Sequence, residues 1–193
     1  MSDLQQLDPG KSYTYADYLQ WKFEERLELN KGKIFKMPPA PSMRHQRVSG
    51  HLFRELSWWL KNKSCHVFAA PFDVRLSKKG KKDEQIQTVV QPDLCVICDD
   101  AKLDDRGCIG SPDIIIEILS PGNTKKEMRY KFRLYEENKV AEYWVVFAAE
   151  ELIQIYRLNE QHKYVADDPY VPGDEISSPL LPGFILNVEE VFV

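Results

Sequence analysis

The sequence predicts an α/β fold, in which a mixed central β-sheet is flanked by helices after an N-terminal helix and a β-hairpin. Short apolar segments alternate along the chain with segments whose apolar residues recur at helical spacing. The segment Asp113–Leu119 is β-branched and almost wholly apolar, which is typical of a strand covered on both faces. At 193 residues, with 43% apolar content, the chain is long enough for a single domain with one full core. Residues 1–13 are expected to form a loose N-terminal segment.

The first elements follow from capping and turn signals. Thr14 can cap a helix that runs to about Glu24. Arg26–Asn30 and Lys33–Met37 alternate polar and apolar residues around Lys31-Gly32, which predicts a β-hairpin. The prolines that follow end this hairpin.

A long helix is expected from Ser42 to about Asn62, because apolar residues form a stripe along it. Ser120-Pro121-Gly122 ends the apolar strand, and a basic helix follows from about Thr124 to Asn138. The tail from Tyr164 carries two Pro-Gly turn signals and is expected to end in a short strand and a helical turn. The remaining strands are expected at residues 65–69, 72–76, 88–97, 142–147 and 152–158.

Composition excludes several classes of protein. No apolar run reaches the roughly 20 residues that cross a bilayer, and the N-terminus lacks the pattern of a secretory signal, so a cytoplasmic location with no membrane partner is expected. Cys95 and Cys98 form a C-x-x-C inside an apolar strand, and the chain holds no second close-spaced pair for zinc. Reduced, buried cysteines are therefore expected.

The net charge of −4 does not suggest a basic nucleic-acid-binding domain, but it leaves room for local basic surfaces. The stretch Lys78–Lys82 contains a glycine and precedes two acidic residues, which favours a solvated hairpin tip. The helix near residues 124–138 carries a second group of basic residues, namely Lys125, Lys126, Arg129, Lys131 and Arg133.

Two carboxylates lie in apolar segments that are predicted to form buried strands, where a charged residue is not expected. Asp93 follows Pro92 in an apolar strand, and Glu117 lies near the end of another. A buried carboxylate is costly unless it is paired, hydrogen-bonded or metal-bound, and one divalent cation would relieve both at once. The alternatives are a salt bridge for Glu117 and a strand-end cap for Asp93. A pairing of Asp113 with Glu117 is disfavoured, because four residues of strand separate them by roughly 13 Å.

Three stretches of the chain together resemble the Uma2 family of restriction-endonuclease-like proteins. They are VVQPDLCVICDD, GSPDIIIEILSPGNTKKEMRYKFRLYEENKVAEYWVV and the upstream ERLELNKGKIFKMPPAPSMRHQRVSGHL. The resemblance extends from about Tyr15 to Phe192. It implies a PD-(D/E)XK fold, with a mixed sheet flanked by helices, and metal-dependent hydrolysis of phosphodiester bonds.

The resemblance also implies the site residues. Asp93 takes the place of the first aspartate and Glu117 that of the (D/E)XK glutamate. The lysine expected two positions after Glu117 is Leu119 in this chain. In similar proteins that lysine lies on the next helix, where the K-x-x-x-Y pattern is formed by Lys131 and Tyr135, which share one helix face.

Three further residues complete the candidate set. Glu28 matches the first glutamate of the family and is a candidate metal ligand or orienting residue, with an exposed hairpin carboxylate as the alternative. His45 also matches the family, although a surface or capping role is the alternative. The backbone carbonyl of Ile118 is a candidate extra ligand for Mg²⁺ or Mn²⁺. Gln91 shares a strand face with Asp93, but a plain hydrogen bond is favoured for it.

Two functions from different classes remain open. The first is a metal-dependent endonuclease that acts on nucleic acid, with DNA favoured, and that works as a homodimer so that both strands are cut. The second is a catalytically inactive protein that keeps the nuclease fold for binding or assembly, which the acidic net charge and Leu119 favour.

Overall fold

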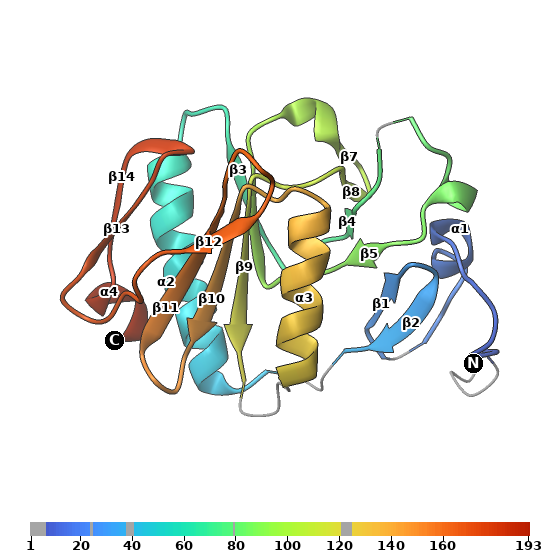
Figure 1. The fold of residues 1–193 in the computed structure, drawn as a ribbon, viewed down its shortest axis with the longest axis horizontal. Coiled ribbons are helices and arrows are strands. Elements are labelled where there is room, and N and C mark those ends of the chain that lie inside the picture. The colour runs from blue at the N-terminus through green and yellow to red at the C-terminus, as the bar shows by residue number, and fades with distance from the viewer. Residues whose placement is uncertain (1–6, 24, 38–40, 79, 121–124) are drawn as a thin grey trace. The chain divides into compact units, whose positions relative to one another are not determined.

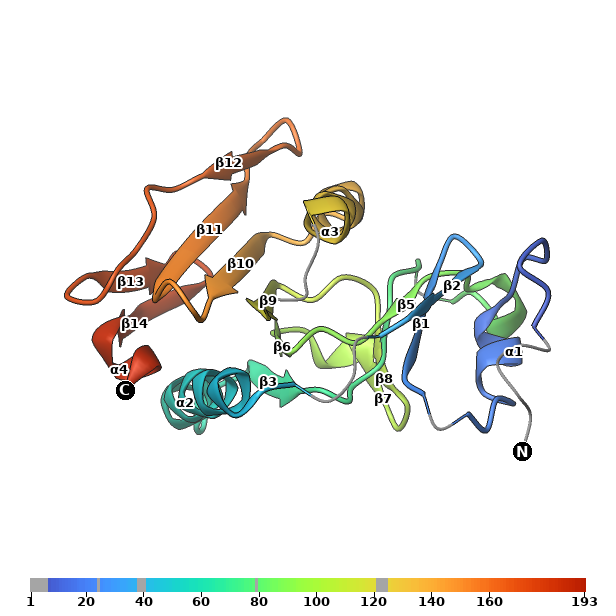
Figure 2. The ribbon, with the colours of Figure 1, turned by 90° about the horizontal axis from the view of Figure 1, so that it is seen from below.

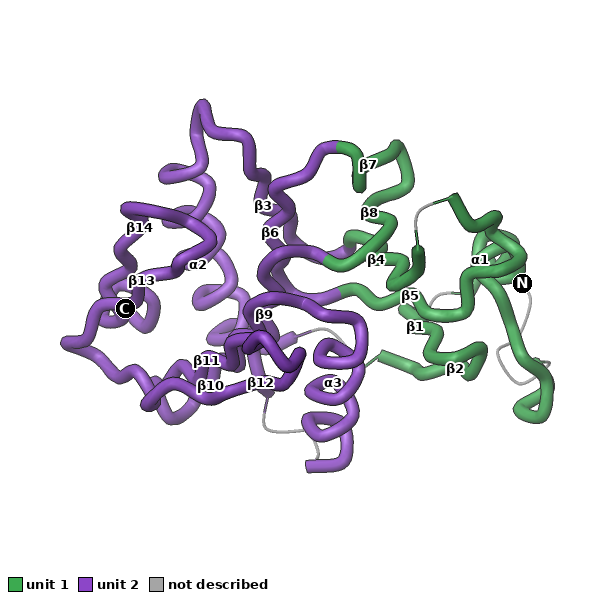
Figure 3. Tube along the Cα trace, turned by 45° about the horizontal axis from the view of Figure 1, so that its top comes forward, with its two compact units in different colours: residues 1–39, 72–91, 101–111 green, residues 40–71, 92–100, 112–193 purple. Residues whose placement is uncertain are grey.

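The computed structural model describes residues 7–23, 25–37, 41–78, 80–120 and 125–193. The expected end of the first helix at Glu24, the prolines at 38 and 39 and the expected helix start at Thr124 lie outside the described residues. The chain forms two compact units, each built from several segments (Figure 3). Unit 1 comprises residues 1–39, 72–91 and 101–111, and unit 2 comprises residues 40–71, 92–100 and 112–193.

Unit 2 contains a six-stranded mixed sheet with the strand order β12-β11-β10-β9-β6-β3. β9 and β10 are parallel and are connected through a helix, whereas the other neighbours are antiparallel. The strands of this sheet are β3 (His66–Ala69), β6 (Leu94–Ile97), β9 (Ile114–Leu119), β10 (Glu142–Phe147), β11 (Leu152–Leu158) and β12 (Tyr164–Ala166).

Helices cover both faces of this sheet (Figures 1 and 2). α2 (Met43–Leu60) packs on one face and α3 (Lys125–Glu137) covers the other. A C-terminal hairpin of β13 (Glu175–Ser178) and β14 (Leu181–Asn187) leads into the short helix α4 (Glu189–Phe192). The predicted α/β class with a mixed, helix-flanked sheet is therefore confirmed.

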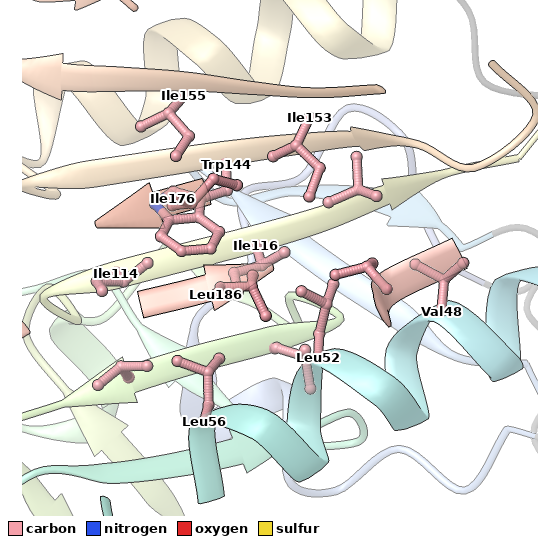
Figure 4. Close-up of a cluster of buried hydrophobic side chains, with 14 of the residues drawn as sticks. Val48, Leu52, Leu56, Ile114, Ile116, Trp144, Ile153, Ile155, Ile176 and Leu186 are labelled. Atoms are coloured by element: carbon pink, nitrogen blue, oxygen red, sulfur yellow. The ribbon is translucent and has the colours of Figure 1, made fainter. Parts of the chain in front are cut away.

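The core of unit 2 follows from the alternation of side chains along the strands. Ile114, Ile116 and Trp144 lie on the face that meets the apolar stripe of α2, where Leu52 and Leu56 are fully buried (Figure 4). The intervening strand residues must then point to the opposite face, toward α3. Glu117 is one of those residues.

Unit 1 contains a second six-stranded sheet, with the order β2-β1-β5-β4-β8-β7. The predicted hairpin around Lys31-Gly32 is present, with both turn residues at positive φ. The elements of this unit are α1 (Tyr15–Tyr18), β1 (Leu27–Asn30), β2 (Lys33–Lys36), β4 (Val74–Arg75), η2 (Asp83–Gln85), β5 (Val89–Val90), β7 (Leu103–Asp104) and β8 (Gly107–Ile109), while the turn η3 (Asp100–Lys102) leads into β7.

Three expectations for unit 1 differ from the structure. The first helix begins with a capping box of Thr14 and Asp17 but ends after one turn, at Tyr18, and Trp21 packs against Tyr18 outside the helix. The strand expected at 72–76 is reduced to two residues. The hairpin of β7 and β8 was not predicted. It contains Gly107 at φ 119°, where an added Cβ would meet a backbone oxygen at 2.2 Å.

The expectation of reduced cysteines is wrong for two of the four. Cys65 and Cys98 form a disulfide. They lie one step beyond the last paired residues of β3 and β6, His66 and Ile97, so the antiparallel register brings them opposite each other. Cys95 and Cys108 are buried, as expected.

Candidate active site

Asp93 and Glu117 meet at one edge of the unit 2 sheet. β6 and β9 are antiparallel, with Leu94 opposite Ile116. The same register carried one residue further places Asp93 opposite Glu117, at the point where the ladder ends, so the two residues are neighbours. Proline at position 92 has no N–H and helps to end the ladder here, which leaves Asp93 outside the strand proper.

α3 supplies two partners for the buried carboxylate of Glu117, which is 6% exposed. Lys131 Nζ donates to Glu117 Oε1 at 2.8 Å, and the hydroxyl of Tyr135 donates to the same oxygen at 2.5 Å. Residues four apart share a helix face, so α3 presents both side chains to β9 together. The ammonium and the hydroxyl both favour an ionised Glu117.

Asp93 is held by the opposite helix and by β9. Its Oδ2 accepts a hydrogen bond from the backbone N–H of Ile118 at 2.8 Å and lies 3.2 Å from His45 Nε2. His45 lies in the first turn of α2, where the Ser42 side chain accepts from the His45 backbone N–H. The side chain of Asp93 is 23% exposed, so this carboxylate reaches solvent.

His45 is nearly buried, and its charge state depends on the two carboxylates. Burial by itself lowers the pKa of the imidazole, but the hydrogen bond to Asp93 and the negative charges of Asp93 and Glu117 outweigh burial and leave the pKa raised. Within the described residues, His45 Nδ1 is buried without a hydrogen-bond partner. The same negative charges that stabilise an imidazolium would stabilise any cation placed here.

Tyr143 of β10 adjoins the site and was missed in the sequence, where it reads as an ordinary strand residue. Its ring lies 5.0 Å from that of Tyr135 in an edge-on arrangement. Burial, followed by the charge of Glu117, raises the pKa of Tyr143 well above its ordinary value. Tyr143 therefore stays neutral and forms an apolar wall behind Glu117.

The oxygen donors at this edge suit Mg²⁺ or Mn²⁺. Asp93, Glu117 and the carbonyl of Ile118 are hard oxygen ligands of the kind those ions prefer. Within the described residues, no group of three or more His, Cys, Asp or Glu side chains is arranged to hold a metal. Mg²⁺ commonly binds one or two carboxylates and takes its other ligands from water and substrate phosphate. The donor set fits such an open site and does not fit a closed zinc site.

Glu28 belongs to unit 1 and has its own partners there. Its Oε1 accepts from the Gln91 backbone N–H at 3.0 Å, and the Gln91 side-chain amide donates to Asp73 Oδ1 at 2.8 Å and to Tyr18 at 3.1 Å. Gln91 thus makes the hydrogen bonds that were favoured for it. The role of Glu28 as a metal ligand stays a prediction.

The alternative carboxylate, Asp113, marks the entry of β9. Its Oδ2 accepts from the Cys98 backbone N–H at 2.8 Å. Its side chain serves a backbone N–H at the end of the sheet opposite to Glu117. Leu119, where a lysine was expected, is the last residue of β9.

A mixed sheet with two carboxylates at one edge, and a lysine presented from the adjoining helix, defines a protein of the restriction-endonuclease-like class. The sequence matches the family described as "Uma2: Putative restriction endonuclease" over residues 15–189. This protein belongs to the Uma2 family.

Two further proteins are similar to this chain. The uncharacterized protein slr1290 of Synechocystis sp. is 28% identical over 160 residues, which cover 79% of this chain and 77% of that protein. A crystal structure described as a putative nuclease belonging to DUF820 from Anabaena variabilis superposes with a TM-score of 0.71 at 18% identity, and covers 93% of this chain and 97% of that one. The second likeness establishes the fold. Among the described residues, no helix has the length and apolar character to span a membrane.

Proposed function

We propose that this protein is a metal-dependent endonuclease that hydrolyses phosphodiester bonds in DNA. The observation that carries the proposal is the convergence of Asp93 and Glu117 at one sheet edge, with Lys131 in contact with Glu117. Membership of the Uma2 family supports the nuclease class. The choice of Mg²⁺ or Mn²⁺ rests on the oxygen donors of the site, and the choice of DNA rests on the description of the family as restriction endonuclease-like.

Phosphodiester hydrolysis requires an oriented water, and negative charge must be stabilised as it develops on the phosphate. Asp93, Glu117 and the Ile118 carbonyl would hold Mg²⁺ or Mn²⁺, and such a cation lowers the pKa of water and neutralises charge on phosphate. Lys131 keeps its ammonium beside Glu117, where it can orient the water or pair with a phosphate oxygen.

Tyr135 and His45 act as positioning residues in this scheme. Tyr135 is fully buried and its hydroxyl donates a hydrogen bond to Glu117, so it orients that carboxylate. His45 holds Asp93 from the α2 side. The two carboxylates are thus oriented by opposite helices.

The exposed face of α3 can steer a phosphate backbone toward this edge. Lys125, Lys126, Arg129 and Arg133 are exposed on the helix that carries Lys131. Basic side chains attract nucleic acid without regard to sequence and in a salt-dependent way. This local surface offsets the negative net charge of the chain.

Plasmid cleavage tests the proposal. Supercoiled plasmid should be nicked or linearised by the wild type with Mg²⁺ or Mn²⁺, and left intact with EDTA. Asp93→Ala and Lys131→Ala should each lower the rate at least about 100-fold, because each removes a group that acts on the reacting phosphate. Asp168→Ala removes an exposed carboxylate of unit 2 and serves as the matched control. Equal cleavage by Asp93→Ala and the wild type would refute the site.

One observation favours a second function. Leu119 replaces the expected lysine, and both carboxylates already have protein partners. A catalytically inactive binding protein with this fold would retain plasmid in a mobility-shift assay and leave it uncut with every divalent metal. Cleavage by the wild type that is lost in Asp93→Ala excludes this alternative.

A further inference from the structure

A second surface of unit 2 combines aromatic and basic side chains. It is a groove of about 620 Å³ between the C-terminal half of α2 and β3. These two elements lie side by side (Figures 1 and 2). The groove is lined chiefly by Phe53, Arg54, Trp58, Lys61, Lys63, His66 and Phe68, a set called the α2–β3 groove below.

The aromatic side chains of the α2–β3 groove are unusually open to solvent. Trp58 is 75% exposed and Phe53 is 37% exposed. Both lie outside the buried apolar stripe of α2. An exposed tryptophan on a soluble surface is uncommon and often marks a binding site. Its flat ring offers a stacking surface without any rearrangement of the backbone.

Basic side chains lie directly over aromatic rings here. Lys61 Nζ lies 5.6 Å from the centre of the Trp58 ring, and Lys63 Nζ lies 3.6 Å from that of Trp59. The first contact keeps an ammonium group beside the exposed Trp58 ring, whereas Trp59 packs against the core and does not line the groove. The Trp58 ring and the ammonium groups of Lys61 and Lys63 are therefore presented in one short segment, residues 58–63.

The charge of the α2–β3 groove is opposite to that of the whole chain. Of the described residues that line it, three are Lys or Arg and none is acidic. Arg54 pairs with Glu55 at 2.7 Å and His66 with Asp100 at 3.0 Å, but these pairs are exposed and weak. A chain with a net charge of −4 thus keeps a cationic, aromatic groove.

We infer that the α2–β3 groove binds single-stranded nucleic acid, with a base stacked on Trp58 and phosphates contacted by Lys61 and Lys63. Aromatic platforms beside a cationic track are how proteins bind unpaired strands without sequence preference. A duplex hides its base faces, so it fits the phosphate contacts but not the stacking. An acidic peptide would use the charges but would leave the flat exposed ring unexplained.

The position of the groove along α2 relates it to the candidate active site. His45 lies in the first turn of the helix and Trp58 lies thirteen residues later, which corresponds to roughly 20 Å of helix. A strand that occupies the groove would be held on the same helix that orients Asp93. Nucleic acid is assigned as the ligand of the groove partly because the proposed function is that of a nuclease, so this inference rests on the proposed function.

Binding without cleavage tests the inference separately from catalysis. The probe is a labelled oligothymidylate of about 20 nucleotides, longer than the roughly 4–16 nucleotides that such a site covers. Fluorescence anisotropy is measured in EDTA, so that no metal-dependent cleavage occurs. Trp58→Ala should weaken binding about 10-fold or more, and Trp58→Phe should restore most of it, because phenylalanine still stacks.

Charge variants give a second readout. Lys61→Gln with Lys63→Gln should lower the slope of log K against log salt by about 1.4, since each phosphate contact contributes about 0.7 on single strands. Lys139→Gln with Lys163→Gln removes the same charge from two exposed lysines elsewhere in unit 2 and should leave the slope nearly unchanged. The duplex of the same length should bind more weakly and should not respond to Trp58→Ala.

Two outcomes would overturn the inference. One is oligothymidylate binding that is absent, or equal in the wild type, Trp58→Ala and the lysine variant. The other is light scattering that shows a homodimer lost in Trp58→Ala while binding of the oligonucleotide is unchanged, which would assign the groove to a second copy of this chain. A wild type that binds the probe through Trp58 but cleaves no plasmid with any divalent metal would refute the nuclease proposal alone, whereas cleavage by a wild type whose binding is unaffected by Trp58→Ala would refute this inference alone.

Discussion

Glu117 shows how a single buried charge is maintained at the residue scale. An isolated carboxylate in an apolar sheet is costly, and Lys131 and Tyr135 offset that cost by donating to one of its oxygens. Removing one partner from a buried ion pair leaves an incompletely compensated charge. Lys131 and Tyr135 should therefore stabilise the fold through Glu117, and this effect can be measured separately from the proposed hydrolysis.

Tyr135→Phe should destabilise the protein with little change in shape. The variant keeps the ring and its contact with Tyr143 but removes the 2.5 Å hydrogen bond to Glu117. A hydrogen bond to a charged group contributes about 1.5–3 kcal/mol, so the free energy of unfolding should fall by roughly that amount. Urea denaturation followed by circular dichroism measures it.

Tyr156→Phe is the matched control for this variant. Tyr156 belongs to the same aromatic cluster, and its hydroxyl makes no hydrogen bond to the residues that the structure describes. The control should stay within about 0.5 kcal/mol of the wild type. If Tyr135→Phe proved as stable as Tyr156→Phe, the bond to Glu117 would contribute nothing to folding.

The candidate site was accessible from the sequence because its residues break local rules. Asp93 and Glu117 are charged residues in apolar strands, and Lys131 and Tyr135 share a helix face. The contact of His45 with Asp93 depends on how α2 packs at the sheet edge, and no spacing in the sequence expresses that packing. Tyr143 obeys the strand pattern, so no sequence signal marks it.

At the scale of elements, the segment 88–97 shows where the prediction of strands from apolar character fails. Its apolar character predicted one strand, but the structure divides it into β5 of unit 1 and β6 of unit 2. Proline cannot donate to a sheet ladder, and Pro92 lies at the break. The apolar pattern of these residues indicates a buried strand but does not indicate which sheet the strand joins. It therefore could not show that the chain passes from one sheet to the other at Pro92.

The connection of α3 to β12 should depend on pH through Glu136. Its carboxylate accepts from the Tyr164 backbone N–H and from Lys163, both at 2.9 Å, and these contacts lower the pKa of Glu136. A depressed pKa adds stability at pH values above the unfolded pKa of about 4.5, and that stability is lost as the pH falls through the folded value.

Glu136→Gln should therefore lower the free energy of unfolding by up to about 1 kcal/mol near pH 7. The difference from the wild type should shrink below about pH 4.5, as the native carboxyl becomes protonated. Urea denaturation of both proteins at several pH values provides the comparison. A difference that stayed constant down to pH 3 would show that the charge of Glu136 is not involved.

The disulfide between β3 and β6 gives a second prediction at this scale. It joins cysteines 33 residues apart, so in the chain-entropy account it stabilises the protein by about 3–4 kcal/mol. Cys65→Ser with Cys98→Ser should lose much of that stability, and reduction of the wild type should match it. Cys95→Ala alters a buried cysteine outside the disulfide, so reductant should still destabilise this control, whereas it should leave the variant with Cys65→Ser and Cys98→Ser unchanged.

Mass spectrometry after alkylation of unfolded, unreduced protein identifies the pairing directly. Two alkyl groups per chain are expected without reductant and four with it. Four groups without reductant would show that Cys65 and Cys98 remain thiols under the conditions of preparation.

At the scale of the whole molecule, each unit is assembled from distant parts of the chain. Unit 1 takes three segments and unit 2 takes the intervening ones, so the backbone passes repeatedly between them. Composition and linker signals showed no boundary, because the sequence at these passages has no long stretch rich in glycine or serine. The candidate metal ligands Asp93 and Glu117 nevertheless lie in one unit, as do His45, Lys131 and Tyr135. A cation held by these residues should stabilise unit 2.

Thermal unfolding in Mn²⁺ tests that statement. A ligand that binds the native state alone stabilises it by about 2.7 kcal/mol at 100 times its dissociation constant. For a chain of this length that corresponds to a rise in Tm of roughly 5–10 °C.

Asp93→Asn should abolish the rise because it removes a ligand of the cation, whereas Asp168→Asn, on an exposed loop of unit 2, should keep it. Glu28→Gln should also keep it if Glu28 is no ligand, and lose it if the family resemblance correctly assigns that residue to the metal. A Tm that does not move in millimolar Mn²⁺ would rule out a metal site formed by the free protein.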